Sequence, residues 1–153
     1  MIKVAYVEDD PNFRNFVSDF LKNSPEFEFI SSFGSVEDLL AEARIIKQPD
    51  ILLLDISLPG MSGLEAIRLI KNAFPRMEII MFTIHDDSER IFKALCAGAS
   101  GFLLKSTPIP KMKEYLHQVY RGEAAMSPSI ARKVIHFFRP KEVKKEKQNR
   151  LLH

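Results

Sequence analysis

The sequence predicts an α/β protein in which a doubly wound, five-stranded parallel sheet carries helices on both faces. Short apolar runs alternate with longer amphipathic runs along the chain, which is the pattern of strands joined by crossover helices. The short runs are rich in Val, Ile, Leu and Phe, as expected for strands buried on both faces. A length of 153 residues suits one domain, and we see no second apolar core and no internal repeat.

The predicted elements follow one another in five strand and helix pairs. The strands are expected at Lys3–Val7, Phe27–Phe33, Ile51–Leu54, Glu78–Phe82 and Gly101–Leu104. The helices are expected at Asn12–Asn23, Val36–Lys47, Ser62–Phe74, Ser88–Ala97 and Pro108–Arg121.

Several helix ends carry recognisable signals. Ser35 can cap the second helix with Asp38 three residues further on, and Gly98 can end the fourth helix. Pro108 suits the first turn of the fifth helix, where a missing N–H costs nothing.

A sixth helix is predicted where Ser127 and Pro128 supply an N-cap and a first helical residue. The apolar stripe that can pack on the body consists of Ile130, Val134, Ile135 and Phe138. Pro140 then breaks the pattern. We therefore expect a main domain, an additional C-terminal helix and a basic linker or tail, at residues 1–122, 123–138 and 139–153.

The net charge of +2 is unevenly distributed. Residues 139–153 hold six basic against two acidic side chains, which leaves the preceding 138 residues with 16 basic against 18 acidic. Such a basic end could touch nucleic acid, but a short run of mixed charge is more typical of a solvated linker or helix face.

Composition also bounds the compartment. No apolar run approaches the roughly 20 residues that a membrane helix needs, and the start of the chain lacks the regions of a secretory signal. The single Cys96 has no partner for an internal disulfide, and we interpret it as a small core residue. We therefore expect a cytoplasmic protein with no membrane segment.

Polar residues gather where the predicted strands end. These residues are Glu8, Asp9 and Asp10 after the first strand, Asp55 after the third, Thr83 after the fourth and Lys105 after the fifth. In the common flavodoxin-like strand order 2-1-3-4-5, the first and third strands are neighbours, and ligands bind at the carboxyl ends of the strands. We therefore expect the acidic side chains of these two strands to face each other.

Such an acidic cluster requires protonation or a cation. Two carboxylates about 4 Å apart repel by roughly 4 kcal/mol at an effective dielectric constant near 20. Magnesium fits because it prefers oxygen ligands and works with one or two carboxylates plus phosphate oxygens. The pattern indicates phosphoryl transfer with Asp55 as the nucleophile, while Lys105 and Thr83 stabilise the phosphoryl oxygens.

Each residue also has a simpler interpretation. Asp10 could simply be the N-cap of the first helix, without a role in a site. Asp55 could simply be a turn residue that follows its strand. Thr83 and Lys105 would be ordinary strand and surface residues if each stood alone. Their joint placement at one sheet edge favours the functional interpretation.

Taken together, these residues resemble the receiver domains of two-component response regulators, and the resemblance covers essentially residues 1–121. Five features in order and register carry the resemblance: Val7-Glu8-Asp9-Asp10, the segment from Asp55 through Ser57-Leu58-Pro59-Gly60 to Gly63, Thr83, Phe102 and Lys105.

The resemblance implies a role for each of these residues. Asp55 would accept a phosphoryl group from a sensor histidine kinase, and Thr83 with Phe102 would form the switch pair. The Thr83 hydroxyl would move toward the phosphoryl group while the aromatic ring turns inward. The Mg²⁺ ligands would be Asp9, Asp55 and the Ser57 carbonyl, with Glu8 acting through water. Such a protein is a signalling switch that catalyses its own phosphorylation and dephosphorylation, not an enzyme with a separate substrate.

The segment 97–106, with Gly122-Glu123 and Ser127-Pro128, is similar to the NarL/LuxR subgroup of DNA-binding regulators. In that subgroup a helix-turn-helix domain follows a linker, so we expect an effector domain that is missing from this chain and through which DNA would be bound. A homodimer on phosphorylation would fit this class. A stand-alone single-domain receiver is the alternative.

Three positions depart from the family pattern. Ile84 stands where many receivers have a small residue and could narrow access to the phosphoryl group. Glu8 replaces the commoner aspartate, and Ser106 follows the lysine where many receivers have proline.

Other functions fit the sequence less well. An aspartate-nucleophile phosphatase needs a second acid two residues beyond the nucleophile, where this chain has Ser57. A flavin phosphate would be repelled by the three acids after the first strand. A degenerate receiver that works without phosphate would not need the full set of acidic, Thr and Lys groups.

Overall fold

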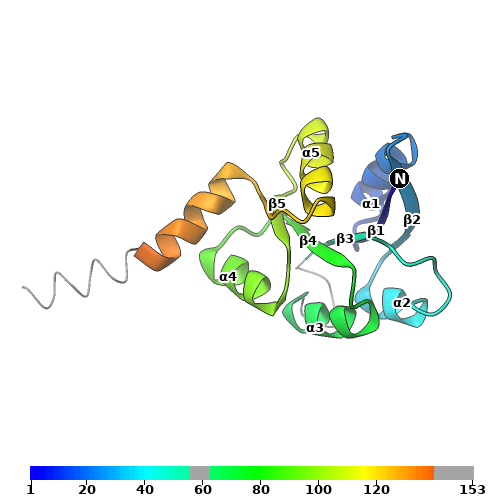
Figure 1. Ribbon diagram of the computed structural model, residues 1–153, viewed down its shortest axis with the longest axis horizontal. Coiled ribbons are helices and arrows are strands. Elements are labelled where there is room, and N and C mark those ends of the chain that lie inside the picture. Colours follow the sequence, from blue (N-terminus) through cyan, green and yellow to red (C-terminus); the bar gives the residue numbers. More distant parts are fainter. Residues whose placement is uncertain (56–62, 140–153) are drawn as a thin grey trace, which may run out of the picture.

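The computed structural model describes residues 1–55 and 63–139. Its sheet is parallel, with the strand order β2-β1-β3-β4-β5-β6 (Figure 1). The strands are β1 Ile2–Val7, β2 Phe27–Phe33, β3 Ile51–Leu54, β4 Glu78–Thr83, β5 Gly101–Leu104 and β6 Ala125–Met126. The predicted order of the first five strands is confirmed. The sixth was not predicted, because two residues are too few to show a periodic pattern.

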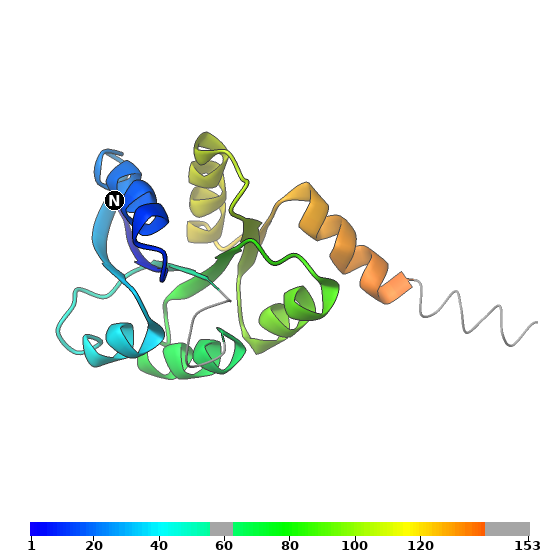
Figure 2. The ribbon, with the colours of Figure 1, turned by 180° about the vertical axis from the view of Figure 1, so that it is seen from behind.

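The helices lie on both faces of the sheet, as predicted (Figures 1 and 2). They are α1 Pro11–Lys22, α2 Val36–Ala41, α3 Gly63–Ala73, α4 Ser88–Ala97 and α5 Ile109–Tyr120. A further helix spans residues 128–139. Helices α1 and α5 cover one face, whereas α2, α3 and α4 cover the other, with the 128–139 helix beside α4.

The sheet separates two apolar cores. Along β3, Leu52 and Leu54 belong to the core under α2, α3 and α4, whereas Ile51 and Leu53 belong to the core under α1 and α5. All four side chains are fully buried. This explains why the strand reads as a continuous apolar run in the sequence.

Several predicted caps are confirmed. The Ser35 side chain accepts a hydrogen bond from the Asp38 amide, and Gly98 ends α4 with a φ of 118°. Asp10 caps α1 by accepting from the amides of Asn12 at 3.0 Å and Phe13 at 3.4 Å, so the simpler interpretation of this residue holds.

The second helix is shorter than predicted. We expected it to run to Lys47, but α2 ends at Ala41 and the chain continues in tight turns. The amides of Glu42 and Ala43 bond to carbonyls three residues earlier, which tightens the backbone beyond an α-helix. Ala43 and Ile46 still pack on the core beyond the end of α2. The helical spacing of apolar residues therefore continues past Ala41, which is why the sequence predicted a longer helix.

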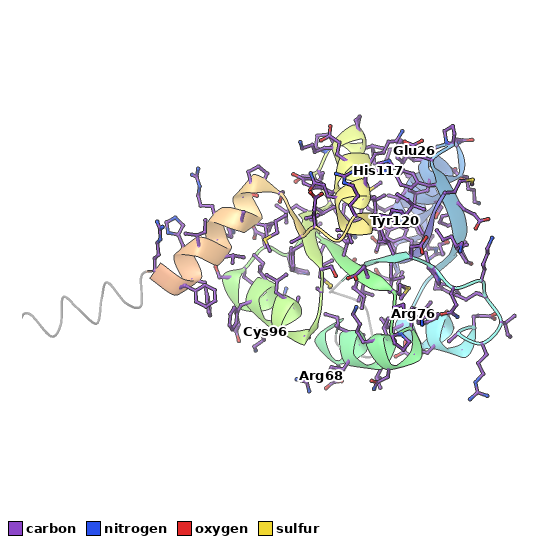
Figure 3. The ribbon with its side chains drawn as sticks, viewed as in Figure 1. Glu26, Arg68, Arg76, Cys96, His117 and Tyr120 are labelled. Atoms are coloured by element: carbon purple, nitrogen blue, oxygen red, sulfur yellow. The ribbon has the colours of Figure 1, made fainter. Side chains whose placement is uncertain are left out.

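The interpretation of Cys96 as a core residue is wrong. Its thiol is free and exposed on α4 (Figure 3). The face of α4 that packs on the sheet is set by Ile91 and Ala94, and Cys96 lies two positions beyond Ala94, on the opposite side of the helix. Within the described residues, no helix has both the length and the apolar character to cross a membrane.

We predict that Gly101→Ala destabilises the protein. A Cβ at this position would lie 2.6 Å from the Ala125 carbonyl oxygen, because β5 and β6 pair side by side there. Overpacking of this kind should lower the free energy of unfolding by about 1–3 kcal/mol, measurable by denaturant titration. Gly34→Ala is the control, since the nearest neighbour of its added Cβ is a side-chain atom of Arg14 at 3.3 Å and not a backbone atom. Equal stability of the two variants would contradict the prediction.

Candidate functional site

The sheet register brings the predicted acids to one edge. In the β1–β3 pair Val7 lies opposite Leu54, so Glu8 and Asp55 follow neighbouring strands at the same level. Backbone bonds continue past the strand ends: the Glu8 amide donates to Phe33 O at 2.9 Å and the Asp55 amide donates to Val7 O at 3.2 Å. These bonds fix where the two side chains begin.

The three predicted carboxylates form a cluster. Glu8, Asp9 and Asp55 each offer one carboxylate oxygen, and these oxygens all lie within 4.8 Å of one another. Glu8 is fully buried and Asp55 is 2% exposed, whereas Asp9 is exposed to solvent. The cluster therefore opens to solvent on the Asp9 side.

Lys105 reaches into this cluster, as predicted. Its ammonium forms ion pairs with Glu8 and with Asp55, the latter with an Nζ–Oδ2 distance of 2.9 Å. The Lys105 amide donates to Thr83 O at 2.9 Å, which extends the β4–β5 ladder to the site. The ammonium also lies 4.8 Å from the centre of the Phe13 ring, which favours a cation there.

The charges of the site shift the pKa values of its members. Burial raises the pKa of Glu8 to about 7, and the charge of Asp55 adds to this, whereas the hydrogen bond from Lys105 opposes it. Burial alone would lower the pKa of Lys105, but its hydrogen bonds to Glu8 and Asp55 outweigh burial and raise it. The lysine therefore keeps its positive charge between the two acids.

Two side chains that sequence reasoning missed support Glu8. The Tyr6 hydroxyl donates to Glu8 Oε1 at 3.2 Å, and the Arg14 guanidinium donates to Glu8 O at 2.7 Å. Burial and the Glu8 carboxylate raise the pKa of Tyr6 far above its ordinary value, so the hydroxyl keeps its proton. Strand alternation could have found Tyr6, which lies two residues before Glu8 on the same face. The Arg14 contact depends on how α1 packs.

Thr83 is the last residue of β4 and is fully buried. Its hydroxyl accepts a hydrogen bond of 3.2 Å from the His85 amide, so it holds the loop that follows the strand. Phe102 pairs with Met81 across the β4–β5 ladder and is also fully buried. The Phe102 ring therefore already points inward in this structure. That it turns inward on phosphorylation stays a prediction. Ser57, the remaining predicted ligand, lies outside the described residues.

Comparison with known proteins identifies the family. The sequence profile described as the response regulator receiver domain matches residues 4–117. The chain belongs to this family.

Curated relatives of the receiver include the response regulator protein VraR. The chain is 28% identical to the protein of Staphylococcus epidermidis strain RP62A and 29% identical to that of Staphylococcus aureus strain Mu3, over 129 residues in each case. The match covers 84% of this chain but 61% of each relative. The chain thus spans about three fifths of the length of the curated relatives it matches.

Solved structures agree. The chain matches a two-component response regulator of the LuxR family from Aurantimonas sp. SI85-9A1 with a TM-score of 0.80 and 29% identity, covering 88% of this chain and 95% of that one. The isolated REC domain of RcsB from Salmonella enterica serovar Typhimurium matches with a TM-score of 0.78 over 86% of this chain and 97% of that one. At 21% identity, the second match supports the fold alone. The first of these two structures is described as a LuxR-family regulator, and both share the fold of this chain.

The donor set of the receiver suits magnesium. Receiver domains bind Mg²⁺, and the three carboxylates of this site are hard oxygen ligands of the kind that Mg²⁺ takes. A residual negative charge remains after Lys105 has paired, because one ammonium faces three carboxylates. A divalent cation would neutralise it.

We predict that Glu8 makes stability fall as pH rises toward 7 in metal-free buffer. Its folded pKa is raised from 4.5 to about 7, so the folded state binds more protons than the unfolded state between these values. Glu8→Gln should flatten this part of the stability curve in denaturant titrations at pH 5 to 8 with a chelator present. Glu42→Gln, at an exposed position after α2, should keep the wild-type slope. A slope that survives in Glu8→Gln would show that another group causes it.

Proposed function

We propose that Asp55 of this receiver accepts a phosphoryl group from a sensor histidine kinase. The observation that supports the proposal is the convergence of Glu8, Asp9 and Asp55 at one sheet edge, where the Lys105 ammonium pairs with two of them, Glu8 and Asp55. In the proposed step an Asp55 oxygen bonds to phosphorus while the phosphorus–nitrogen bond of the phosphohistidine breaks, and the nitrogen keeps the electron pair.

The residues around Asp55 have separate roles in this step. Lys105 lies 2.9 Å from Asp55 Oδ2 and can pair with the oxygens of the incoming phosphoryl group. Bound Mg²⁺ would neutralise the carboxylates and the phosphoryl oxygens, held by Asp9, Asp55 and the Ser57 carbonyl, with Glu8 acting through water. Tyr6 orients the Glu8 carboxylate by donating a hydrogen bond to it, and the Tyr6 hydroxyl can do so because it stays protonated.

We propose that Thr83 and Phe102 carry the signal away from Asp55. The Thr83 hydroxyl would leave the His85 amide for a phosphoryl oxygen. The predicted inward turn of Phe102 would require a state in which the ring points outward, because the ring is already buried in this structure. Such a change is a shift between two states, biased by contacts that exist only with the added anion.

The proposal extends to the organisation of the longer protein. Residues 1–122 would form the receiver, residues 123–138 an additional C-terminal segment with β6 and most of the 128–139 helix, and residues 139–153 a basic linker to an effector domain. The greater length of the VraR relatives supports a longer protein, which we propose to be a LuxR-type regulator that binds DNA through that domain. We further propose a cytoplasmic signalling protein that forms homodimers on phosphorylation and has no separate substrate.

We predict that incubation with Mg²⁺ and acetyl phosphate adds one phosphoryl group to Asp55. Intact mass should show the gain in the wild type and in Asp19→Asn, an exposed position on α1, but not in Asp55→Asn. A gain that persists at the wild-type level in Asp55→Asn would place the acceptor elsewhere.

We predict opposite effects of Lys105→Met on metal binding and on phosphoryl transfer. Mg²⁺ should bind several-fold more tightly, because the ammonium that competes for Glu8 and Asp55 is gone. Transfer from acetyl phosphate should slow by about 100-fold, the usual effect of losing one donor to a developing anion. Calorimetry and intact mass separate the two effects, and Lys111→Met, a surface ion pair on α5, is the control. Weaker Mg²⁺ binding in Lys105→Met would contradict the assigned role.

A further inference from the structure

The helix over residues 128–139 is packed firmly on the receiver. Ile130 is fully buried in the same core as Phe102 and Ile91. Phe137 stacks on Phe92 of α4 with ring centres 4.4 Å apart and an angle of 22°. The helix therefore extends the layer formed by α2, α3 and α4, as Figures 1 and 2 show.

A second contact joins this helix to the β4–α4 loop, residues 84–87. Lys133 Nζ donates to both the backbone oxygen and the Oδ2 of Asp86, each at 2.9 Å. The pair joins positions 47 residues apart in the sequence, and about half of the Asp86 side chain is exposed. The contact thus lies at the surface, away from the packed core.

Thr83 holds the same loop at the residue next to Asp86. The Thr83 hydroxyl accepts from the His85 amide at 3.2 Å, one residue before Asp86. Two side chains, one buried at the site and one on the outer helix, therefore fix adjacent residues of one short loop. If the Thr83 hydroxyl moved away from His85, this stretch of the loop would lose one of its two contacts and would rest more on Lys133.

We propose that Lys133 is a positioning residue for Thr83, which couples the 128–139 helix to phosphorylation. This inference rests on the proposed function, in which the Thr83 hydroxyl turns toward a phosphoryl oxygen. Lys133 stabilises the loop in the arrangement that keeps the hydroxyl on His85, and so opposes that turn. The coupling is reciprocal. An anion bound at Asp55 weakens the contact between Lys133 and Asp86, and loss of that contact raises the affinity of the site for the anion.

The coupling is measured with beryllofluoride in the presence of Mg²⁺. Lys133→Ala should bind this phosphoryl mimic about two- to five-fold more tightly than the wild type, the range expected for losing one surface ion pair. Lys133→Arg, which keeps a cation able to reach Asp86, should return to the wild-type affinity. Arg132→Ala removes the same charge from an exposed neighbouring position and should have no effect.

Hydrogen exchange supplies an independent readout in the wild-type protein. Beryllofluoride should speed amide exchange in the β4–α4 loop and the first turns of the 128–139 helix, and this acceleration should already be present in Lys133→Ala without the mimic. Unchanged affinity in Lys133→Ala, or unchanged exchange on binding, overturns the inference while the proposed function stands. A wild-type chain that binds no beryllofluoride overturns the proposed function and the inference with it.

Discussion

The Lys105 ammonium between two buried carboxylates is the interaction on which the site depends. Glu8 is fully buried and Asp55 nearly so, and each would be costly to keep charged without a partner. One lysine, brought by β5, serves both. Because the Asp9 side of the cluster opens to solvent, a second cation and a phosphoryl group can approach without unfolding the edge. In the proposed function, Mg²⁺ and the phosphoryl group would therefore compete with the ion pairs that Lys105 forms with Glu8 and Asp55.

The fold places this contact through the register of its strands. Neighbouring β1 and β3 end at the same level, so their first loop residues are adjacent, and the backbone bonds of Glu8 and Asp55 continue the ladder. Two apolar cores clamp the sheet from both faces, which leaves the carboxyl edge as the place where polar groups gather. The same edge leads through Thr83 and the following loop to the C-terminal helix. In the proposed function, this short loop would connect the phosphorylation site to the C-terminal helix.

Much of this arrangement was predictable, because strand ends and strand order alone bring Glu8, Asp55 and Lys105 together. What the sequence could not predict depends on packing between distant segments. The pairing of Lys133 with Asp86 spans 47 residues and has no local signal. The end of α2 at Ala41 was hidden because tight turns preserved the apolar spacing, and β6 is too short for any period to appear. The exposure of Cys96 follows from which face of α4 meets the sheet, and that face is set by its neighbours.

The acidic edge is proposed to bind a phosphoryl group on Asp55 beside a hard cation and Lys105. The most direct measurement is a crystal structure of the chain with Mg²⁺ and beryllofluoride. Beryllium bonded to an Asp55 oxygen, with the Lys105 ammonium on a fluoride and Mg²⁺ on Asp9 and Asp55, is the result that we predict. Beryllofluoride bound at another residue, or Mg²⁺ held away from these carboxylates, would contradict the account.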